Sequence, residues 1–178
     1  YAEASGKPVV LCLSGKGSDA SRVRDLVARA RSNGIRSVFA VTGDRSEKHS
    51  ASERSRRIKP YEKGYLDSVE IIRSVREHDP DFCIGAAINP FKYNPVDQCL
   101  QYYKMIRKLE SGAEYIVTHA GWDMKKLQEL QWFLRMREIG HAVVARVLLL
   151  SVEDIGNIHR GLFPGVHVPL PFAAALQR

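Results

Sequence analysis

The sequence predicts a parallel α/β fold made of five β-α units in series, the unit from which a (β/α)8 (TIM) barrel is built. Uninterrupted apolar runs of strand length alternate with helix-period segments along the chain, and strands buried on both faces are typical of parallel sheets. In addition, two strands carry polar residues only at the carboxyl end, as Thr42-Gly43-Asp44 and Thr118-His119. Active sites of parallel α/β proteins form at such strand ends.

Strands and helices are predicted in regular alternation. The strands are expected at 8–14, 37–42, 81–88, 115–118 and 142–149. The helices are expected at 19–32, 66–77, 95–110, 123–138 and 152–160. Ser18 is expected to cap the first helix, and Gly34 and Gly140 are expected to stop the first and fourth helices.

Each of the first four helices is placed by apolar side chains that form one stripe on its surface. The residues expected to face inward are Val23, Leu26, Val27 and Ala30 in the first helix, Val69, Ile72 and Val75 in the second, Val96, Cys99, Tyr103 and Ile106 in the third, and Leu127, Leu130 and Leu134 in the fourth. Residues 1–5 resemble the tail of a preceding helix, and 168–178 break off in a helix-like run with no closing strand. We therefore expect residues 1–178 to form one partial barrel domain, the middle of a larger barrel.

Composition indicates a globular protein of a reducing compartment. Of 178 residues, 44% are hydrophobic and 26% charged, and no apolar run approaches the roughly 18 residues that span a bilayer. Cys12, Cys83 and Cys99 lack metal-binding spacing, so we expect small buried hydrophobic side chains and no metal site. We expect a cytoplasmic protein that contacts no membrane and forms a homo-oligomer or belongs to a larger chain.

A net charge of +7 is compatible with a nucleic-acid partner, but its distribution argues against one. The excess gathers in the segment 45–63, which holds seven basic and three acidic residues and no aromatic residue before Tyr61. Nucleic-acid grooves usually combine basic residues with stacking aromatic side chains. We therefore interpret the segment as a solvated loop able to close over an anionic ligand, and expect no nucleic-acid partner.

A dinucleotide-binding pattern follows the first strand. Gly15-Lys-Gly17-Ser-Asp-Ala20 fits GxGxxA, opens a helix, and is followed by the acidic Asp44 at the end of the next strand. A Rossmann-type NAD-binding enzyme is therefore an alternative. We favour a barrel, in which Gly15 and Gly17 turn the chain from strand to helix, because the later units repeat without the change of pattern expected at a second Rossmann half.

Several motifs resemble those of the methylenetetrahydrofolate reductase family over nearly the whole chain. They are Val-Thr42-Gly43-Asp44, Gly85-Ala-Ala-Ile-Asn89-Pro90, Arg107-Lys108-x-x-x-Gly112-Ala113, Thr118-His119 with Asp123, and Val168-Pro169. The resemblance implies a (β/α)8 barrel holding FAD, which takes a hydride from NAD(P)H and reduces 5,10-methylenetetrahydrofolate to 5-methyltetrahydrofolate. By that alignment the chain carries strands three to seven and lacks the strand with the proton-donating glutamate, so this fragment alone is expected to be inactive.

The resemblance also implies site residues. The flavin-side positions are Thr42, Gly43, Asp44 and Asn89. The positions for the pyrophosphate and adenosine of FAD are Gln101, Lys104, Arg107 and Lys108. Lys and Arg suit a diphosphate, although cations at a helix carboxyl end also complement its dipole. Asp44, which would tune the flavin, and His119, which would contact the substrate, are the catalytic candidates.

Other positions depart from the family pattern. His119 replaces a glutamine that contacts folate and nicotinamide, and Leu11 or Cys12 replaces a flavin-contacting histidine. The segment 146–149 replaces a glycine–proline strand end that shapes the folate site. The FAD side thus matches better than the folate side. The alternative is a folate- or corrinoid-linked methyl-transfer or accessory barrel without reductase activity.

Overall fold

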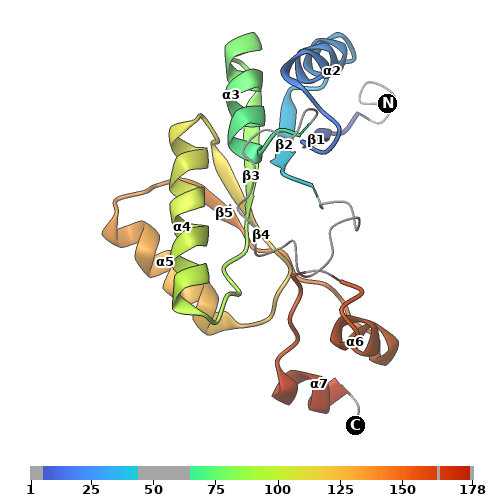
Figure 1. Cartoon of the computed structure of the whole chain (residues 1–178), viewed down its shortest axis with the longest axis vertical. Helices are drawn as coiled ribbons and strands as arrows, with labels where there is room; N and C mark the ends of the chain where they lie inside the picture. The colour runs from blue at the N-terminus through green and yellow to red at the C-terminus, as the bar shows by residue number, and fades with distance from the viewer. Residues whose placement is uncertain (1–5, 44–64, 164, 177–178) are drawn as a thin grey trace. The chain divides into compact units, whose positions relative to one another are not determined.

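A computed structural model describes residues 6–43, 65–163 and 165–176, and its five strands form one sheet in chain order, β1-β2-β3-β4-β5 (Figure 1). The strands are β1 (Val10–Ser14), β2 (Ser37–Val41), β3 (Cys83–Ile88), β4 (Tyr115–Thr118) and β5 (Ala142–Val144). The helices are α2 (Ala20–Ser32), α3 (Ser68–His78), α4 (Pro95–Glu110), α5 (Met124–Met136), α6 (Val152–His159) and α7 (Leu170–Leu176). The predicted parallel α/β fold, with strands in the sequential order of a TIM barrel, is confirmed.

The chain divides into two compact units, and the first comprises Tyr1–Ala86 with Lys108–Ala113. In this unit β1 and β2 pair in parallel from Val10↔Ser37 to Ser14↔Val41, and α2 packs on α3. Its fully buried side chains are mostly β-branched, which suits strands and helices packed on both faces: Val23, Val27, Val38, Ile71, Ile72, Val75 and Ile84. The single partial barrel domain expected over residues 1–178 stays a prediction.

The second unit comprises Ala87–Arg107 and Glu114–Arg178. Strands β4 and β5 pair in parallel here, and the rings of Tyr102 on α4 and Phe133 on α5 lie 4.5 Å apart between centroids. A small hydrophobic cluster holds α6 and α7 together through Ile155, Ile158, Val168 and Ala173. The helix-like run expected near the carboxyl end is therefore helix α7, anchored by its own apolar side chains.

The dinucleotide-binding pattern proves to be a strand-to-helix turn. The Gly15 N–H donates to the Val41 carbonyl (3.1 Å), and the Gly15 carbonyl accepts from the Leu66 N–H (3.1 Å). A Cβ at Gly15 would overlap the Leu66 carbonyl oxygen, so the glycine is required by a neighbouring backbone. In a Rossmann sheet β1 lies centrally, whereas here β1 stands first in the strand order. The Rossmann alternative is therefore wrong.

The prediction of the inward face of α4 was wrong. Val96 and Tyr103 are 68% and 61% exposed, Ile106 is half-buried, and the buried side chains are Tyr102 and Met105. The helix has apolar side chains on two faces, and contact with Phe133 of α5 decides which one is buried. The same shift exposes Cys99.

The predicted burial of the other two cysteines was also wrong. Cys12 is exposed and Cys83 is only half-buried. Side chains of a strand alternate between its two faces, and on β1 it is the neighbouring Leu13 that is buried. Position in a strand therefore did not suffice to bury Cys12.

Two helix ends and one strand end differ from expectation. The N-cap of α2 is Asp19, whose carboxylate accepts from the Arg22 N–H (2.9 Å), while Ser18 donates to the Ser14 carbonyl. Helix α5 ends at Met136, and Glu138 rather than Gly140 takes the left-handed backbone conformation, at φ 56°. Strand β5 ends at Val144, opposite Val117 of β4, and beyond it the Arg146 N–H donates to the side chain of Thr118.

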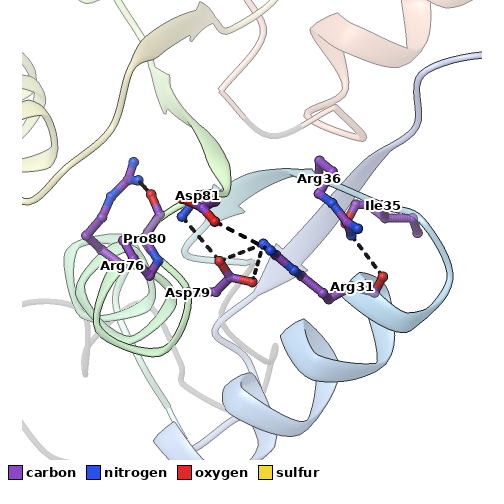
Figure 2. A network of polar contacts seen from close by, with 7 residues as sticks. All are labelled: Arg31, Ile35, Arg36, Arg76, Asp79, Pro80 and Asp81. Atoms are coloured by element: carbon purple, nitrogen blue, oxygen red, sulfur yellow. Dashed lines mark hydrogen bonds and ion pairs between the residues drawn. The ribbon is translucent and has the colours of Figure 1, made fainter.

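Charged side chains connect the carboxyl ends of α2 and α3 in the first unit (Figure 2). Both carboxylate oxygens of Asp79 accept from Arg31 Nη1 at 2.8 Å, and Arg31 Nη2 lies 3.4 Å from Asp81 Oδ2. Arg76 donates to the Pro80 and Gly112 carbonyls. These contacts lie near the amino ends of β2 and β3, the end of a parallel α/β sheet that contributes to stability rather than catalysis.

Candidate functional site

The carboxyl end of β4 is held by hydrogen bonds on both sides within the second unit. The side chain of Thr118 is buried, and its Oγ1 accepts from the Arg146 N–H at 3.0 Å. The next residue, His119, donates its backbone N–H to the Ile88 carbonyl at 2.6 Å. The Gly121 N–H in turn donates to the Arg146 carbonyl at 3.3 Å. The imidazole of His119 thus stands on a fixed backbone, as the prediction of a pocket residue requires.

A cleft of about 370 Å³ opens beside His119. Its lining residues are His119, Arg146, Leu148, Leu162, Phe163 and Val166. Four of the six are apolar, one is a cation and one is an imidazole that can donate or accept a hydrogen bond. Such a lining suits a flat, partly apolar ligand that carries a negative charge, with the polar groups setting its orientation.

Sequence reasoning identified His119 but not Leu162, Phe163 or Val166. These three follow α6 and precede the buried Val168, in a segment with no motif of its own. The available signal was the pair Gly161 and Gly165, because glycines often mark loops, and both have a left-handed φ in the structure. The segment 146–149 was noted only as a departure from the family pattern, yet it supplies Arg146 and Leu148.

The backbone of Gly165 passes close to both predicted polar residues of this unit. Asn89 Nδ2 donates to the Gly165 carbonyl at 3.1 Å. A Cβ placed on Gly165 would lie 3.5 Å from Asn89 Nδ2 and 3.6 Å from His119 Nε2. The structure therefore brings Asn89 and His119 together around one glycine.

Asn89 and Gln101 take part in hydrogen bonds that hold the loop after β3. Asn89 Oδ1 accepts from the Phe91 N–H at 3.1 Å, and the Asn89 N–H donates to Gln101 Oε1 at 3.3 Å. Together with the bond to Gly165, these contacts fix the segment that leaves β3. A ligand that used the Asn89 amide would share it with this loop.

Thr42 and Gly43 follow β2 in the first unit, whereas Asn89 and His119 belong to the second. Thr42 Oγ1 and Ser68 Oγ are 3.2 Å apart. Gly43 has a left-handed backbone, φ 78°, and a Cβ there would overlap Ser14 Oγ. The next residue, Asp44, lies outside the described residues, as does the basic segment 45–63. That these strand ends meet at one rim stays a prediction.

The cationic residues predicted to bind a diphosphate lie on the second half of α4. Lys104 is exposed, and Arg107 and Lys108 are half-buried. A diphosphate needs N–H donors with positive charge, which these three side chains supply, so the donor set fits the diphosphate of FAD. Lys104 and Lys108 are one turn apart on the helix and project from neighbouring positions.

Neither a metal-binding cluster nor a helix suited to cross a membrane occurs in the residues that the structure describes. No group of three or more His, Cys, Asp or Glu side chains is placed to hold a metal ion. Within the same ranges, no helix combines the length and the apolar character needed to cross a bilayer.

Comparison with known proteins gives one family and several distant structures. The family model described as methylenetetrahydrofolate reductase matches residues 3–178. No curated protein matches the chain. Among solved structures, an uncharacterized protein from Clostridium thermocellum that binds two copies of 5-methyl-5,6,7,8-tetrahydrofolic acid is 10% identical, with a TM-score of 0.51 over 96% of this chain and 75% of that one.

Two enzymes share the fold at similar identity. 2,3-Dimethylmalate lyase, of the PEP mutase/isocitrate lyase superfamily, is 9% identical, with a TM-score of 0.53 over 86% of this chain and 57% of that one. Phosphonopyruvate hydrolase is 13% identical, with a TM-score of 0.50 over 90% and 53%. The chain thus spans just over half the length of these enzymes, and at such identities the likeness shows the fold alone.

Proposed function

Since the chain belongs to the methylenetetrahydrofolate reductase family, we propose that the protein takes part in flavin-dependent reduction of 5,10-methylenetetrahydrofolate to 5-methyltetrahydrofolate with NAD(P)H. The observation that carries this proposal is the family match, which runs from residue 3 to residue 178. A match of this length includes every described strand and helix, so it does not depend on any one motif.

The cleft beside His119 supports a folate ligand. A folate has a flat heteroaromatic ring and ends in carboxylates, and the cleft offers four apolar side chains, one imidazole and one guanidinium. Leu148, Phe163 and Val166 would pack against the ring. Arg146 would pair with a carboxylate, a contact for which its planar guanidinium is well suited. His119 would orient the ring by a hydrogen bond.

The residues proposed to bind FAD are those that follow β2 and the cations of α4. Arg107 and Lys108, with Lys104, would neutralise the diphosphate, and Thr42 and Gly43 would stand beside the isoalloxazine ring. When bound, FAD supplies the chemistry that accepts a hydride from the nicotinamide and delivers it to the folate. Asp44 would act electrostatically, because a carboxylate near the ring disfavours its anionic reduced form. Placement and charge are the main contributions that hydride transfer needs from these residues.

A second function is favoured by the contacts of Asn89. Its amide is engaged by Gly165 and Phe91, and His119 stands where the family carries a glutamine. The engaged amide of Asn89 lies at a flavin-side position, and the histidine at 119 lies at a substrate-side position. They favour a barrel that binds a folate for methyl transfer, or an accessory subunit, and the folate-binding Clostridium thermocellum protein shares the fold.

Cofactor binding tests the first part of the proposal. We expect the purified protein to acquire flavin absorption bands when incubated with FAD, and the double variant Arg107→Ala/Lys108→Ala to bind FAD at least tenfold more weakly and with a smaller dependence on salt. The control is Lys125→Ala/Arg135→Ala, which removes two exposed cations from α5. Equal FAD affinity in the two double variants would mean that the α4 cations only complement the helix.

Turnover separates the two functions. The reductase proposal expects flavin-loaded full-length protein to oxidise NAD(P)H in the presence of a quinone and to reduce methylenetetrahydrofolate. Asp44→Asn should slow the folate half-reaction more than the nicotinamide half-reaction. Flavin-loaded protein that binds 5-methyltetrahydrofolate yet turns over no folate would instead support the methyl-transfer or accessory function.

A further inference from the structure

One wall of the cleft at the end of β4 is the segment 146–148, which follows β5 and supplies Arg146 and Leu148. The segment lies beyond the last residue pair of β4 and β5, so strand pairing does not hold it. Its first residue is fixed from β4 and the turn after it, because the Arg146 N–H donates to Thr118 Oγ1 and the Arg146 carbonyl accepts from the Gly121 N–H. Neither of these two contacts reaches Leu148.

Trp122 holds the other end of this wall. Its indole Nε1–H donates to the Leu148 carbonyl at 3.2 Å. The indole nitrogen can only donate, and a half-buried tryptophan is generally placed where that N–H finds an acceptor. Because the Leu148 side chain lines the cleft, this hydrogen bond helps to fix how far the wall lies from the opposite side.

The ring of the same tryptophan supports the opposite wall of the cleft, which consists of Leu162, Phe163 and Val166. The indole stacks on Phe172 of α7, with the ring centroids 5.7 Å apart and the planes inclined by 21°. Trp122, Phe172 and Val166 all pack against the buried apolar cluster that holds α6 and α7 together. One side chain is thus connected to both walls, to one by a hydrogen bond and to the other through the apolar cluster.

We propose that Trp122 is a positioning residue that sets the separation of the two walls, and with it the fit of a flat ring between them. A ring gains from both walls only when the separation matches its thickness, because a gap of about 0.5–1 Å forfeits roughly a quarter to a half of the dispersion attraction. Trp122 does not line the cleft and acts through Leu148. That the ligand is a folate rests on the proposed function, whereas the connection of Trp122 to the walls does not.

The variant Trp122→Phe separates the hydrogen bond from the packing, because it keeps an aromatic ring beside Phe172 and removes the indole N–H. Calorimetric titration with 5-methyltetrahydrofolate should give a Kd at least fivefold higher than that of the wild type. The salt dependence of this Kd should not change, because Arg146 keeps its own backbone hydrogen bonds. The matched control is Trp132→Phe, at a tryptophan of α5 that is 62% exposed, and it should bind the folate as the wild type does.

Tryptophan emission gives an independent signature of the same contact. Trp122 and Trp132 are the two tryptophans of the sequence, so the emission of Trp132→Phe comes from Trp122 alone. Saturation with the folate should change the intensity of that emission, because the Trp122 indole is bonded to a lining residue. The emission of Trp122→Phe, which comes from Trp132, should not respond.

Amide hydrogen exchange tests the placement of the wall without a ligand. In the unliganded protein, Trp122→Phe should raise the exchange rate of the segment 146–150 at least threefold and leave α2 and α3 unchanged. If the wild type binds no folate but the exchange rises as expected, the folate proposal fails and the positioning role stands. Unchanged exchange in Trp122→Phe, or unchanged affinity for a folate that the wild type binds, would show that Trp122 only fills the apolar cluster and would overturn the inference.

Discussion

Glu138 is the one residue other than glycine with a positive φ among the described residues, at 56°. It follows the C-cap Arg137 of α5, and its N–H donates to the Arg135 carbonyl while the Ile139 N–H donates to the Leu134 carbonyl. This is the pattern in which a helix ends on a left-handed residue, most often glycine. The native glutamate therefore holds a conformation that disfavours a Cβ.

We expect Glu138→Gly to raise the free energy of unfolding by about 0.5–1 kcal/mol, because it removes the steric penalty of the left-handed conformation. Urea denaturation measures the change. Gly140→Ala is the matched control: Gly140 has no left-handed φ and no atom near its Cβ position, so this substitution should not destabilise the protein. A loss of stability in Glu138→Gly would show that the glutamate side chain contributes more than its backbone strain.

Tyr93 gives the fold a dependence on alkaline pH. Burial, and then the hydrogen bond to Asp123 Oδ2 (3.1 Å), raise the pKa of Tyr93 to about 12. A tyrosine whose folded pKa lies above its unfolded value of 10.0 stabilises the fold below that unfolded value and loses the contribution as pH rises through 10 to 12.

The free energy of unfolding should accordingly fall between about pH 10 and pH 12 in the wild type, and fall less in Tyr93→Phe. Absorbance of tyrosinate at alkaline pH identifies the late-titrating group, and urea midpoints at several pH values give the stability. Tyr103→Phe, at an exposed tyrosine on the outer face of α4, is the control. Identical pH profiles in the wild type and Tyr93→Phe would contradict this assignment.

The β1–α2 turn shows how an element is shaped by its neighbours. Its two glycines serve different purposes: Gly15 has no room for a Cβ beside Leu66, whereas Gly17 has open space but a left-handed backbone at φ 66°. In a dinucleotide-binding loop the first glycine would make the tight turn and the second would let the backbone approach the pyrophosphate. Here each has a separate structural cause.

Gly15→Ala should therefore lower the free energy of unfolding by more than about 2 kcal/mol, because the new methyl group must displace backbone. Gly17→Ala should cost about 1 kcal/mol, the usual penalty for a left-handed alanine. Thermal or urea unfolding gives both values. If the wild type bound NAD and either substitution abolished that binding, the result would contradict the structural interpretation of this turn and support a dinucleotide-binding loop.

The helices also show that capping residues are enough to predict where a helix begins, whereas periodicity is not always enough to predict which face is buried. Helices α3 and α6 begin with reciprocal capping boxes, Asp67 with Glu70 and Ser151 with Asp154, and both start close to the predicted residue. Hydrogen bonds from the Ser151 hydroxyl and backbone lower the pKa of Asp154, so this cap is strongest with the carboxylate ionised. For α4, by contrast, sequence periodicity allowed two inward faces, and packing selected one.

At the scale of the whole molecule, the cleft beside His119 makes a prediction about ligand binding. A folate that binds the folded state alone should raise the melting temperature with the logarithm of its concentration above Kd, with a stabilisation of about 2.7 kcal/mol at a hundredfold excess over Kd. Arg146→Ala should reduce that gain, because the guanidinium would no longer meet a carboxylate. Arg135→Ala on α5 is the control for loss of charge. Equal shifts in both variants would place the folate outside this cleft.

The sequence by itself determined the type and order of the elements, because caps, apolar periods and glycine stops act within a few residues. It also indicated Thr118-His119 as a polar strand end. The structure places His119 at a cleft, and its role in binding or catalysis stays a prediction. The tertiary structure alone decided which face of α4 is buried. It also assembled the cleft from three segments, around residues 119, 146 and 163, that no local pattern connects. Contacts between residues so distant in sequence depend on how helices, strands and loops pack, and packing selects among faces and loops that are equivalent in local propensity.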